Sequence, residues 1–422
     1  MKKSNENQLI NGKERKKEKL ENTLVFTLCF VLFAPSLNNY LNCFLQTGLK
    51  YEVKYISEAV YIALAGLGVV QAFRCFYKDM KVLTIALFLI LGGACSFFIY
   101  PEIRDVIYED PVDLIYNPLN KLVFFCVPAL IYSSFISDFE KLFGAMVKWA
   151  RVTVITGVFT YVFVAIVKER DLQYMVFSYF LLTSICICIE NFRGTKNKVD
   201  LVLAVIGTFS ILFCGARGAV LSLLSYIILR SMIGDANDLS LKKTTRVTVV
   251  AMLMLIFFLF WEPILEWFLE IGEKMGISSR FLTAIEEGTL LESSGRDKIS
   301  HATWKAIKSN PLGYGIFGDR YATGAYGNGK YTYSHNILLE SICSFGLIFG
   351  TMFIVVFFKR IVRAIRQEKK FYNMTIWSLI PYGIFQLFFS SSMFENVTFY
   401  ILFALIFTNK TGRVDGRNEK VS

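Results

Sequence analysis

The residues best suited to chemistry in this chain are one histidine and two arginines that lie far apart in the sequence. His335 is one of only two histidines in 422 residues, and it closes the one long polar segment between apolar stretches, residues 266–335. A histidine has an unperturbed pKa near 6.5, so it can accept a proton at neutral pH. Arg217 and Arg296 carry permanent positive charge. A base beside two cations could remove a hydroxyl proton while stabilising a departing phosphate. A structural role is the alternative for a lone histidine.

The sequence around Arg296 predicts a helix start. Residues 293–297 read Ser-Ser-Gly-Arg-Asp, which is typical of a serine cap followed by an early acidic residue. The helix is expected to run to about Ser309, where Asn310-Pro311 stops it. Free backbone N–H groups and the helix dipole favour an anion in the first turn, and the arginine fork matches phosphate oxygens. Arg296 is therefore a candidate phosphate ligand, or else a solvated loop arginine.

Arg217 interrupts an apolar stretch in the sequence Cys214-Gly-Ala-Arg-Gly. A charge close to the hydrocarbon of a membrane usually faces a polar cavity and marks a functional site. The alternative is an arginine whose side chain extends to the membrane surface as an anchor.

The polar segment 266–335 holds further candidates. Gly313–Gly318 has the spacing G-x-G-x-x-G, but it follows no predicted strand and opens no clear helix, so we expect a turn rather than a dinucleotide site. The tyrosines that follow could stack on sugar rings and hydrogen-bond their hydroxyls, or could lie at the bilayer interface. They alternate with glycines as Tyr321, Tyr326, Tyr331 and Tyr333. Glu340 lies one turn into the apolar stretch after His335.

The elements that must position these residues are membrane helices. Hydrophobic residues make up 54% of the chain and charged residues only 19%, and the apolar residues form runs long enough to cross a bilayer. We count about twelve predicted spans, with ten to twelve as the range because three are short. The predicted fold class is an all-α polytopic membrane protein with one long loop between spans 9 and 10.

The distribution of charge predicts the orientation. The net charge of +11 gathers in the N-terminal tail and in alternate loops, which all fall on the cytoplasmic side if the N-terminus is inside. The charge is therefore topogenic and does not indicate nucleic-acid binding. The predicted parts are a basic cytoplasmic tail (1–22), spans 1–9 (23–265), an extracytoplasmic loop (266–335), spans 10–12 (336–408) and a cytoplasmic tail (409–422). Chemistry in that loop has no ATP or NAD available.

The nine cysteines indicate neither a disulfide framework nor a metal site. They lie within or at the ends of apolar stretches, and residues 266–335 contain none. No pair has the spacing of zinc ligands, and two histidines cannot complete a site with cysteines buried elsewhere. We expect no metal and no cofactor.

Three blocks of sequence resemble the O-antigen polymerase and O-antigen ligase superfamily of bacterial envelope glycosyltransferases. They are FCGARGAVLSLL around Arg217, SSGRDKISHATWKAIKSNPLGYGIFG from Ser293 and SHNILLESICSFGLIFG from Ser334, in the order that the family shows. One departure is that Gly346 and Gly350 are four apart where the family usually spaces its pair by three. We expect this difference to affect helix packing and not the chemistry.

The resemblance implies a membrane glycosyltransferase of GT-C-like architecture in the bacterial cytoplasmic membrane. It would join polyprenyl-diphosphate-linked oligosaccharides into O-antigen or capsular polysaccharide on the outer face, without a metal. Arg217 and Arg296 would bind the diphosphate, and His335 would act as general base on the acceptor hydroxyl. The predicted substrate contacts are Asn336, Glu340, Arg280 and Tyr333. The predicted partners are the lipid-linked oligosaccharide, the bilayer, and flippase and chain-length regulator proteins.

Two other functions fit parts of the sequence. A ligase that transfers finished polymer to another acceptor needs the same residues. A transporter or flippase for lipid-linked sugars could have the same number of spans, but it should show paired repeats and broken helices in both halves. Here the polar features lie mostly in the second half of the chain.

Overall fold

The computed structural model describes residues 2–49, 54–75, 79–103, 117–167, 174–214, 216–233, 270, 295–327, 329 and 332–408. All regular elements in these ranges are helices, with no strand among them. Five helices are long and apolar enough to cross a membrane: Glu14–Gln46, Ile56–Cys75, Met80–Ile99, Phe139–Val164 and Ile337–Ile365. The prediction of an all-helical membrane protein is confirmed at this level. The last part of the predicted spans 1–9, residues 234–265, lies outside the described residues, as does most of the loop before residue 295.

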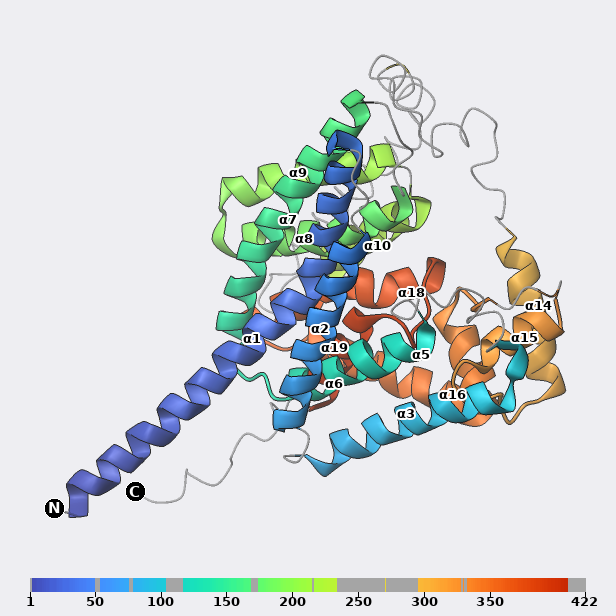
Figure 1. Cartoon of the computed structure of the whole chain (residues 1–422), viewed down its shortest axis with the longest axis horizontal. Coiled ribbons are helices and arrows are strands. Elements are labelled where there is room, and N and C mark those ends of the chain that lie inside the picture. Colours follow the sequence, from blue (N-terminus) through green and yellow to red (C-terminus); the bar gives the residue numbers. More distant parts are fainter. Residues whose placement is uncertain are drawn as a thin grey trace.

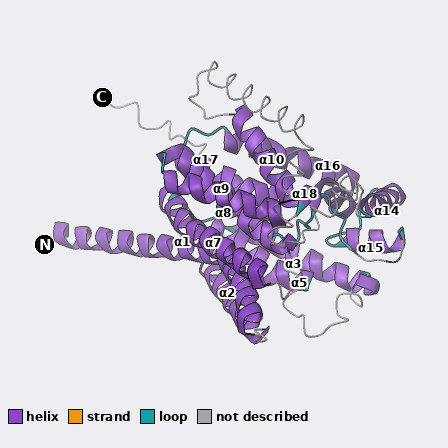
Figure 2. Ribbon diagram, turned by 90° about the horizontal axis from the view of Figure 1, so that it is seen from above, coloured by secondary structure: helices purple, strands orange, loops and turns teal. Residues whose placement is uncertain are grey.

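One group of helices is built on α1 (Lys2–Leu49), the longest in the structure. It packs along α7 (Phe139–Val167), which in turn contacts α8 (Tyr174–Thr195) and α9 (Lys198–Cys214) (Figure 1). Trp149 of α7 stacks on Phe33 of α1 with ring centroids 6.3 Å apart. The N-terminal part of α1 projects from the body of the molecule (Figure 2).

Two apolar segments contain a π-helical turn beside a proline. The first runs through α5 (Pro118–Lys121), η3 (Leu122–Cys126) and α6 (Val127–Ser133), and the second through α17 (Lys370–Ile380), η4 (Pro381–Phe385) and α18 (Gln386–Phe389). Pro128 follows η3 and Pro381 opens η4. A proline has no N–H for the helix ladder and its ring crowds the preceding turn, so the helix widens there. α6 packs against α2 (Lys54–Cys75), α3 (Met80–Ile99) and α19 (Val397–Thr408).

The helices share two common ends. At one end the Ser137 N–H donates to Glu21 Oε1 at 2.8 Å, and Lys370 Nζ donates to the Gly194 carbonyl at 3.2 Å. These contacts bring together α1, the start of α7, the end of α8 and the start of α17, and we call this the α17 end. The opposite end, where α3 ends and α8 and α10 (Arg217–Ile233) begin, is called the site end.

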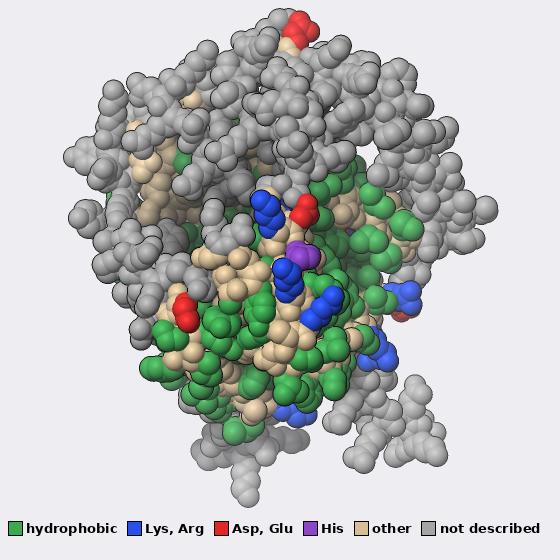
Figure 3. Space-filling view, turned by 90° about the vertical axis from the view of Figure 1, so that its right-hand side faces the viewer, with side chains coloured by type: hydrophobic (Ala, Val, Ile, Leu, Met, Phe, Trp, Pro, Cys, Tyr) green, Lys and Arg blue, Asp and Glu red, His purple; other side chains and the backbone are tan. Residues whose placement is uncertain are grey.

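Three helices from the last third of the chain cover the site end. They are α14 (Arg296–Ser309), α15 (Gly318–Ala325) and α16 (Ile337–Ile365), seen on the right of Figure 1. α14 buries Ala302, Thr303, Ala306 and Ile307. Its outer face exposes Lys298, His301 and Lys305, and Figure 3 shows basic side chains beside a histidine above a largely hydrophobic area.

α16 is broken at Gly346, and a glycine-rich turn fills the break. Gly346 has φ 80° and ψ 168°, which frees the carbonyls of Cys343 and Ser344. These accept the N–H groups of Tyr314 and Gly315 at 2.8 and 2.9 Å, and the Leu347 N–H donates to the Pro311 carbonyl at 2.8 Å. The turn therefore satisfies the backbone groups that the break exposes.

No side chain fits between the turn and the break. A Cβ on Gly313 would lie 2.4 Å from the Gly346 nitrogen, and one on Gly346 would lie 2.5 Å from the Leu312 carbonyl oxygen. A Cβ on Gly350 would lie 2.6 Å from the Ser341 carbonyl oxygen, so the two halves of α16 also approach closely. The glycine pair that departs from the family spacing thus lies at this bend.

Two details of the predicted loop are corrected. The N-cap of α14 is Gly295, with φ 80° and no side-chain cap hydrogen bond, so the predicted serine cap is wrong. Gly318 does open a helix, the eight-residue α15, contrary to expectation. The residues before it form a turn with no strand, as expected. The predicted end of α14 at Ser309 is confirmed, with Asn310 as C-cap.

Candidate active site

The candidate site lies where α10, α14 and α16 begin at the site end. α10 begins at Arg217, and the space beside Gly218 is filled by the Tyr179 hydroxyl of α8 and by Phe389. The carbonyl of the next residue, Ser390, accepts the Tyr333 hydroxyl at 2.9 Å. The Tyr333 ring in turn contacts the His335 ring, with centroids 4.1 Å apart. The structure therefore connects the segments of Arg217 and His335, although the Arg217 side chain lies outside the described part.

His335 has a strained backbone at the entry to α16. Its φ is +54°, in the left-handed region that residues other than glycine rarely adopt and that is common at functional sites. The neighbours on both sides hold it there. The Ser334 N–H donates to Asp319 Oδ2 at 2.8 Å, and the Asn336 side chain caps α16 by accepting the N–H of Leu338 at 2.9 Å.

The surroundings of His335 favour the neutral imidazole. Burial, followed by the positive charges of Arg296 and Arg320, lowers its pKa from the usual 6.5 to about 4. Its Nδ1 atom is buried and has no hydrogen-bond partner in the structure. A neutral imidazole beside two cations can accept a proton, and it would accept one more readily once an anion offsets the arginines.

Arg296 opens α14 and lies within electrostatic reach of His335 and Tyr333. Because no side chain caps this helix, the first backbone N–H groups of α14 have no capping partner from Gly295. A permanent cation beside the N–H groups of a helix start forms a setting for an anion. The predicted phosphate site at Arg296 therefore has a geometric basis, and its role stays a prediction.

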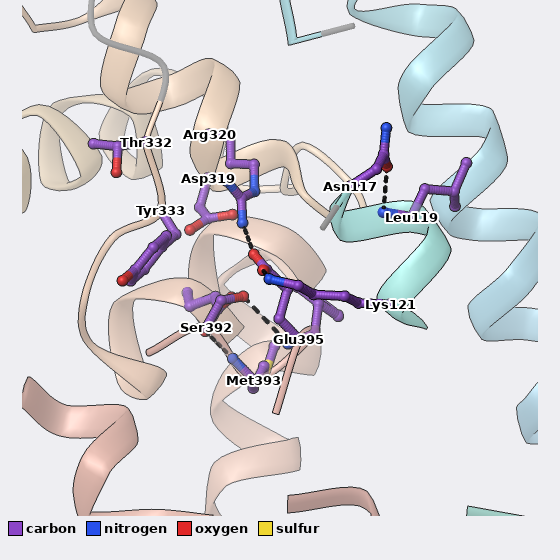
Figure 4. Close-up of polar contacts among 12 residues, drawn as sticks. Asn117, Leu119, Lys121, Asp319, Arg320, Thr332, Tyr333, Ser392, Met393 and Glu395 are labelled. Atoms are coloured by element: carbon purple, nitrogen blue, oxygen red, sulfur yellow. Dashed lines mark hydrogen bonds and ion pairs between the residues drawn. The ribbon is translucent and has the colours of Figure 1, made fainter. Parts of the chain in front are cut away.

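Arg320 of α15 is a site residue that the sequence reasoning missed. It is 7% exposed, and its guanidinium lies over the Tyr333 ring at 5.4 Å and over the Phe317 ring at 5.8 Å. It forms an ion pair with Glu395, which also pairs with Lys121 at 3.0 Å (Figure 4). Burial lowers the pKa of Arg320, against the opposing charge of neighbouring Asp319.

A signal for this network was present in the sequence. Asp319-Arg320 is a charged pair inside a run of glycines, tyrosines and apolar residues, and Glu395 is a lone acid between two apolar stretches. Asp319 is fully buried, and burial raises its pKa against the opposing charge of Arg320 and the Ser334 N–H. A buried charge needs a partner of opposite charge, so Arg320 and the isolated Glu395 could have indicated each other as partners.

The structure gives Asn336 and Glu340 supporting positions. The Asn336 side-chain oxygen is engaged as the cap of α16. Glu340 is 1% exposed, and its carboxylate accepts the Met393 N–H at 2.8 Å and the Ser392 hydroxyl. Asn336 fixes the start of the helix that follows His335, and Glu340 ties that helix to the segment at Ser392 and Met393. Their predicted contact with substrate stays a prediction. Arg280 and Tyr331 lie outside the described residues.

The other predicted tyrosines form a cluster beside the glycine-rich turn. Tyr321 stacks on Tyr100 with centroids 4.5 Å apart, and Ser309 bonds the hydroxyls of Tyr314 and Tyr326 at 2.8 and 2.7 Å. Next to this cluster is a groove of about 850 Å³, which we call the apolar groove. Its walls come from α3, the glycine-rich turn, α16 and α19, and most of its lining residues are phenylalanine, leucine or isoleucine.

Metal ligands do not gather at this site. Within the described ranges, no three of His, Cys, Asp and Glu lie together as ligands of one metal ion would.

Comparison with known proteins identifies one matching family. A family model described as O-antigen ligase matches residues 202–355. The match includes the starts of α10, α14 and α16, and with them Arg217, Arg296 and His335. It supports the superfamily that the three sequence blocks indicated. No curated protein and no solved structure matches the chain.

Proposed function

We propose, from its membership of the O-antigen polymerase and ligase superfamily, that this protein joins lipid-linked oligosaccharide units into a polysaccharide. The donor would be a polyprenyl-diphosphate-linked chain, and the reaction a glycosyl transfer in the bacterial cytoplasmic membrane. The observation that carries the proposal is the position of His335, neutral and strained, with a buried unpartnered nitrogen, within electrostatic reach of Arg296 and Arg320.

The proposed reaction assigns each group one task. The acceptor hydroxyl oxygen attacks the anomeric carbon of the donor sugar, and its proton passes to His335. The bond between that carbon and the diphosphate oxygen breaks, and the electron pair leaves with the diphosphate. Arg217 and Arg296, each at the start of a helix, would bind the diphosphate and offset its growing charge. Positioned acid–base catalysis contributes about 100- to 10,000-fold in rate.

The chain offers a place for the carrier lipid. The lining of the apolar groove includes the glycine-rich turn at Gly313–Gly315 and Met393. The Met393 N–H donates to the carboxylate of Glu340, which lies one turn into α16. The groove therefore borders α16, the helix that begins next to His335. A polyprenyl chain needs an apolar path continuous with the membrane, and this groove supplies one.

We further propose that the site end faces away from the cytoplasm. The predicted cytoplasmic basic clusters support this orientation, because those that are described gather at the α17 end. Members of these clusters include Arg193, Lys196, Lys198, Arg360, Lys369 and Lys370. The positive-inside rule places such an end in the cytoplasm. A flippase would then deliver the lipid-linked units to the outer face of the membrane, at the site end. A chain-length regulator protein would control the length of the polymer at the same face.

Polymerase and ligase activities differ in what accumulates when the gene is deleted. We favour a polymerase, whose loss should leave single repeat units on the carrier lipid. Loss of a ligase should leave long polymer on the carrier. Extraction of lipid-linked sugars from the deletion strain, followed by sizing of the released glycans, separates the two. Normal polymer on its final acceptor in that strain would contradict both.

A further inference from the structure

A second cavity at the site end differs in character from the apolar groove. It has a volume of about 610 Å³ and lies between α1, α2, α5, α8, η4 and the start of α19. This volume is in the range of small-molecule sites, about 300 to 1,000 Å³. We call it the polar cavity.

The lining of the polar cavity combines aromatic rings with groups that bond hydroxyls. Tyr179 and Tyr382 present rings, and Asn39 and Thr183 present an amide and a hydroxyl group. The amide of Asn396, which also lines the cavity, is bonded to the Tyr382 carbonyl and the Phe399 N–H. Apolar residues of α1 complete the walls. Polar groups inside a membrane protein are costly, and they usually mark a substrate path. A lipid chain would offer no hydrogen bond to the Asn39 amide or the Thr183 hydroxyl, whereas a sugar offers apolar C–H faces to the rings and hydroxyls to these polar groups.

The charges on the cavity wall favour a sugar over a phosphate. Lys121 and Glu395 both line it and pair with each other at 3.0 Å. Glu395 also pairs with Arg320, so the carboxylate balances cations that could otherwise attract an anion. A carboxylate and a bound ammonium group instead accept and donate hydrogen bonds to neutral hydroxyls.

The polar cavity is connected to the candidate active site on two sides. Glu395 on its wall bonds Arg320, whose guanidinium stacks on the Tyr333 ring next to His335. Tyr179 on its wall fills the space beside Gly218, the second residue of α10. A sugar in this cavity would therefore be linked to His335 through Glu395, Arg320 and Tyr333.

We propose that the polar cavity binds the acceptor sugar, the one whose hydroxyl is deprotonated by His335. This inference rests on the proposed function and names the substrate subsite that accompanies it. Thr183 and Asn39 would then determine how tightly the acceptor binds, without taking part in the chemistry.

The test measures acceptor binding and turnover with the purified full chain in lipid nanodiscs. The probe is the repeat-unit oligosaccharide cut from the polysaccharide that the host makes, without carrier lipid. Thr183→Leu fills the cavity, and Asn39→Ala removes an amide without adding bulk. Thr156→Leu is the matched control, because Thr156 lies on α7, away from the cavity lining, and bonds the Val152 carbonyl of its own helix. Calorimetry in a His335→Asn background reports binding without reaction.

We expect Thr183→Leu and Asn39→Ala each to weaken probe binding at least tenfold and to raise KM for the acceptor similarly, with kcat unchanged. Thr156→Leu should bind as the parent does. Unchanged binding in both cavity variants, or no binding to the parent protein, would overturn the proposed subsite. Polymer formation that continues in that case leaves the proposed function standing. If the cavity variants weaken probe binding but the wild-type protein forms no polymer, the proposed transfer reaction is rejected and the proposed sugar-binding site is supported.

Discussion

At the scale of residues, His335 is defined by what surrounds it. The sequence could predict a base near two arginines, because only two histidines were available and one preceded an apolar helix. It could not predict the left-handed backbone of His335, which depends on Asp319 holding Ser334 and on Asn336 capping α16. The sequence reasoning also missed Arg320, a further cation near the base. The predicted role of Arg217 stays a prediction, because its side chain lies outside the described part.

The pKa of His335 predicts an unusual pH dependence. His335 is the active base only when unprotonated, so kcat/KM should stay high as the pH falls and decline only near pH 4, instead of near 6.5. Bound diphosphate offsets the arginine charges and raises this pKa, so the acid limb of kcat should lie at higher pH than that of kcat/KM. Rates measured from pH 4 to 8 at low and saturating donor check both.

The control for this prediction removes one of the two arginine charges that lower the pKa of His335, that of Arg320. Arg320→Gln leaves Lys121 to pair with Glu395 and takes away a cation that lowers the pKa of His335. The acid limb of kcat/KM should therefore move to higher pH in this variant. An acid limb already near 6.5 in the wild type, unchanged in Arg320→Gln, would contradict the proposed electrostatics.

At the scale of elements, the break in α16 and the turn that fills it fix the entry to the site. The sequence predicted the end of α14 and a turn at the glycines, because Asn310-Pro311 and repeated glycines are local signals. The docking of this turn on Gly346 could not be predicted, because its backbone hydrogen bonds join residues 29 to 36 positions apart.

Gly346→Ala should therefore damage both stability and activity. The new methyl group meets the Leu312 carbonyl, and φ of +80° is strained for alanine, at a cost of about 1–3 kcal/mol. Gly144→Ala is the control, because Gly144 lies within helix α7 and a Cβ there meets nothing within 4 Å. We expect a lower thermal unfolding temperature in detergent for Gly346→Ala only. Equal temperatures for the two variants would show that the break does not hold the turn.

At the scale of the whole molecule, the predicted class is confirmed and the exact number of spans is not. Five described helices are long enough to cross a membrane, and two shorter apolar segments are interrupted by π-helical turns near Pro128 and Pro381. Sequence periodicity cannot reveal such turns, because they depend on how the neighbouring helices accommodate a proline. The packing of the last helix, α19, against α6 and η4 also depends on tertiary structure.

The proposed orientation predicts which residues an impermeant thiol reagent reaches in intact cells. Lys308→Cys lies on the exposed face of α14 at the site end, and Lys141→Cys lies at the α17 end, where Lys141 pairs with Glu18. In a Cys95→Ser background, which removes the exposed native thiol, Lys308→Cys should be labelled in intact cells. Lys141→Cys should be labelled only after permeabilisation. The reverse pattern would place the site in the cytoplasm.

The most direct test of the central claim uses purified protein in liposomes with the polyprenyl-diphosphate-linked repeat unit. His335→Asn is the sharpest variant, because asparagine tolerates a left-handed backbone better than alanine does and cannot act as a base. We predict that the wild-type protein converts the unit into a ladder of longer lipid-linked products, and that His335→Asn forms them about 100- to 10,000-fold more slowly. No lengthening by the wild type, or equal rates for both proteins, would contradict the account.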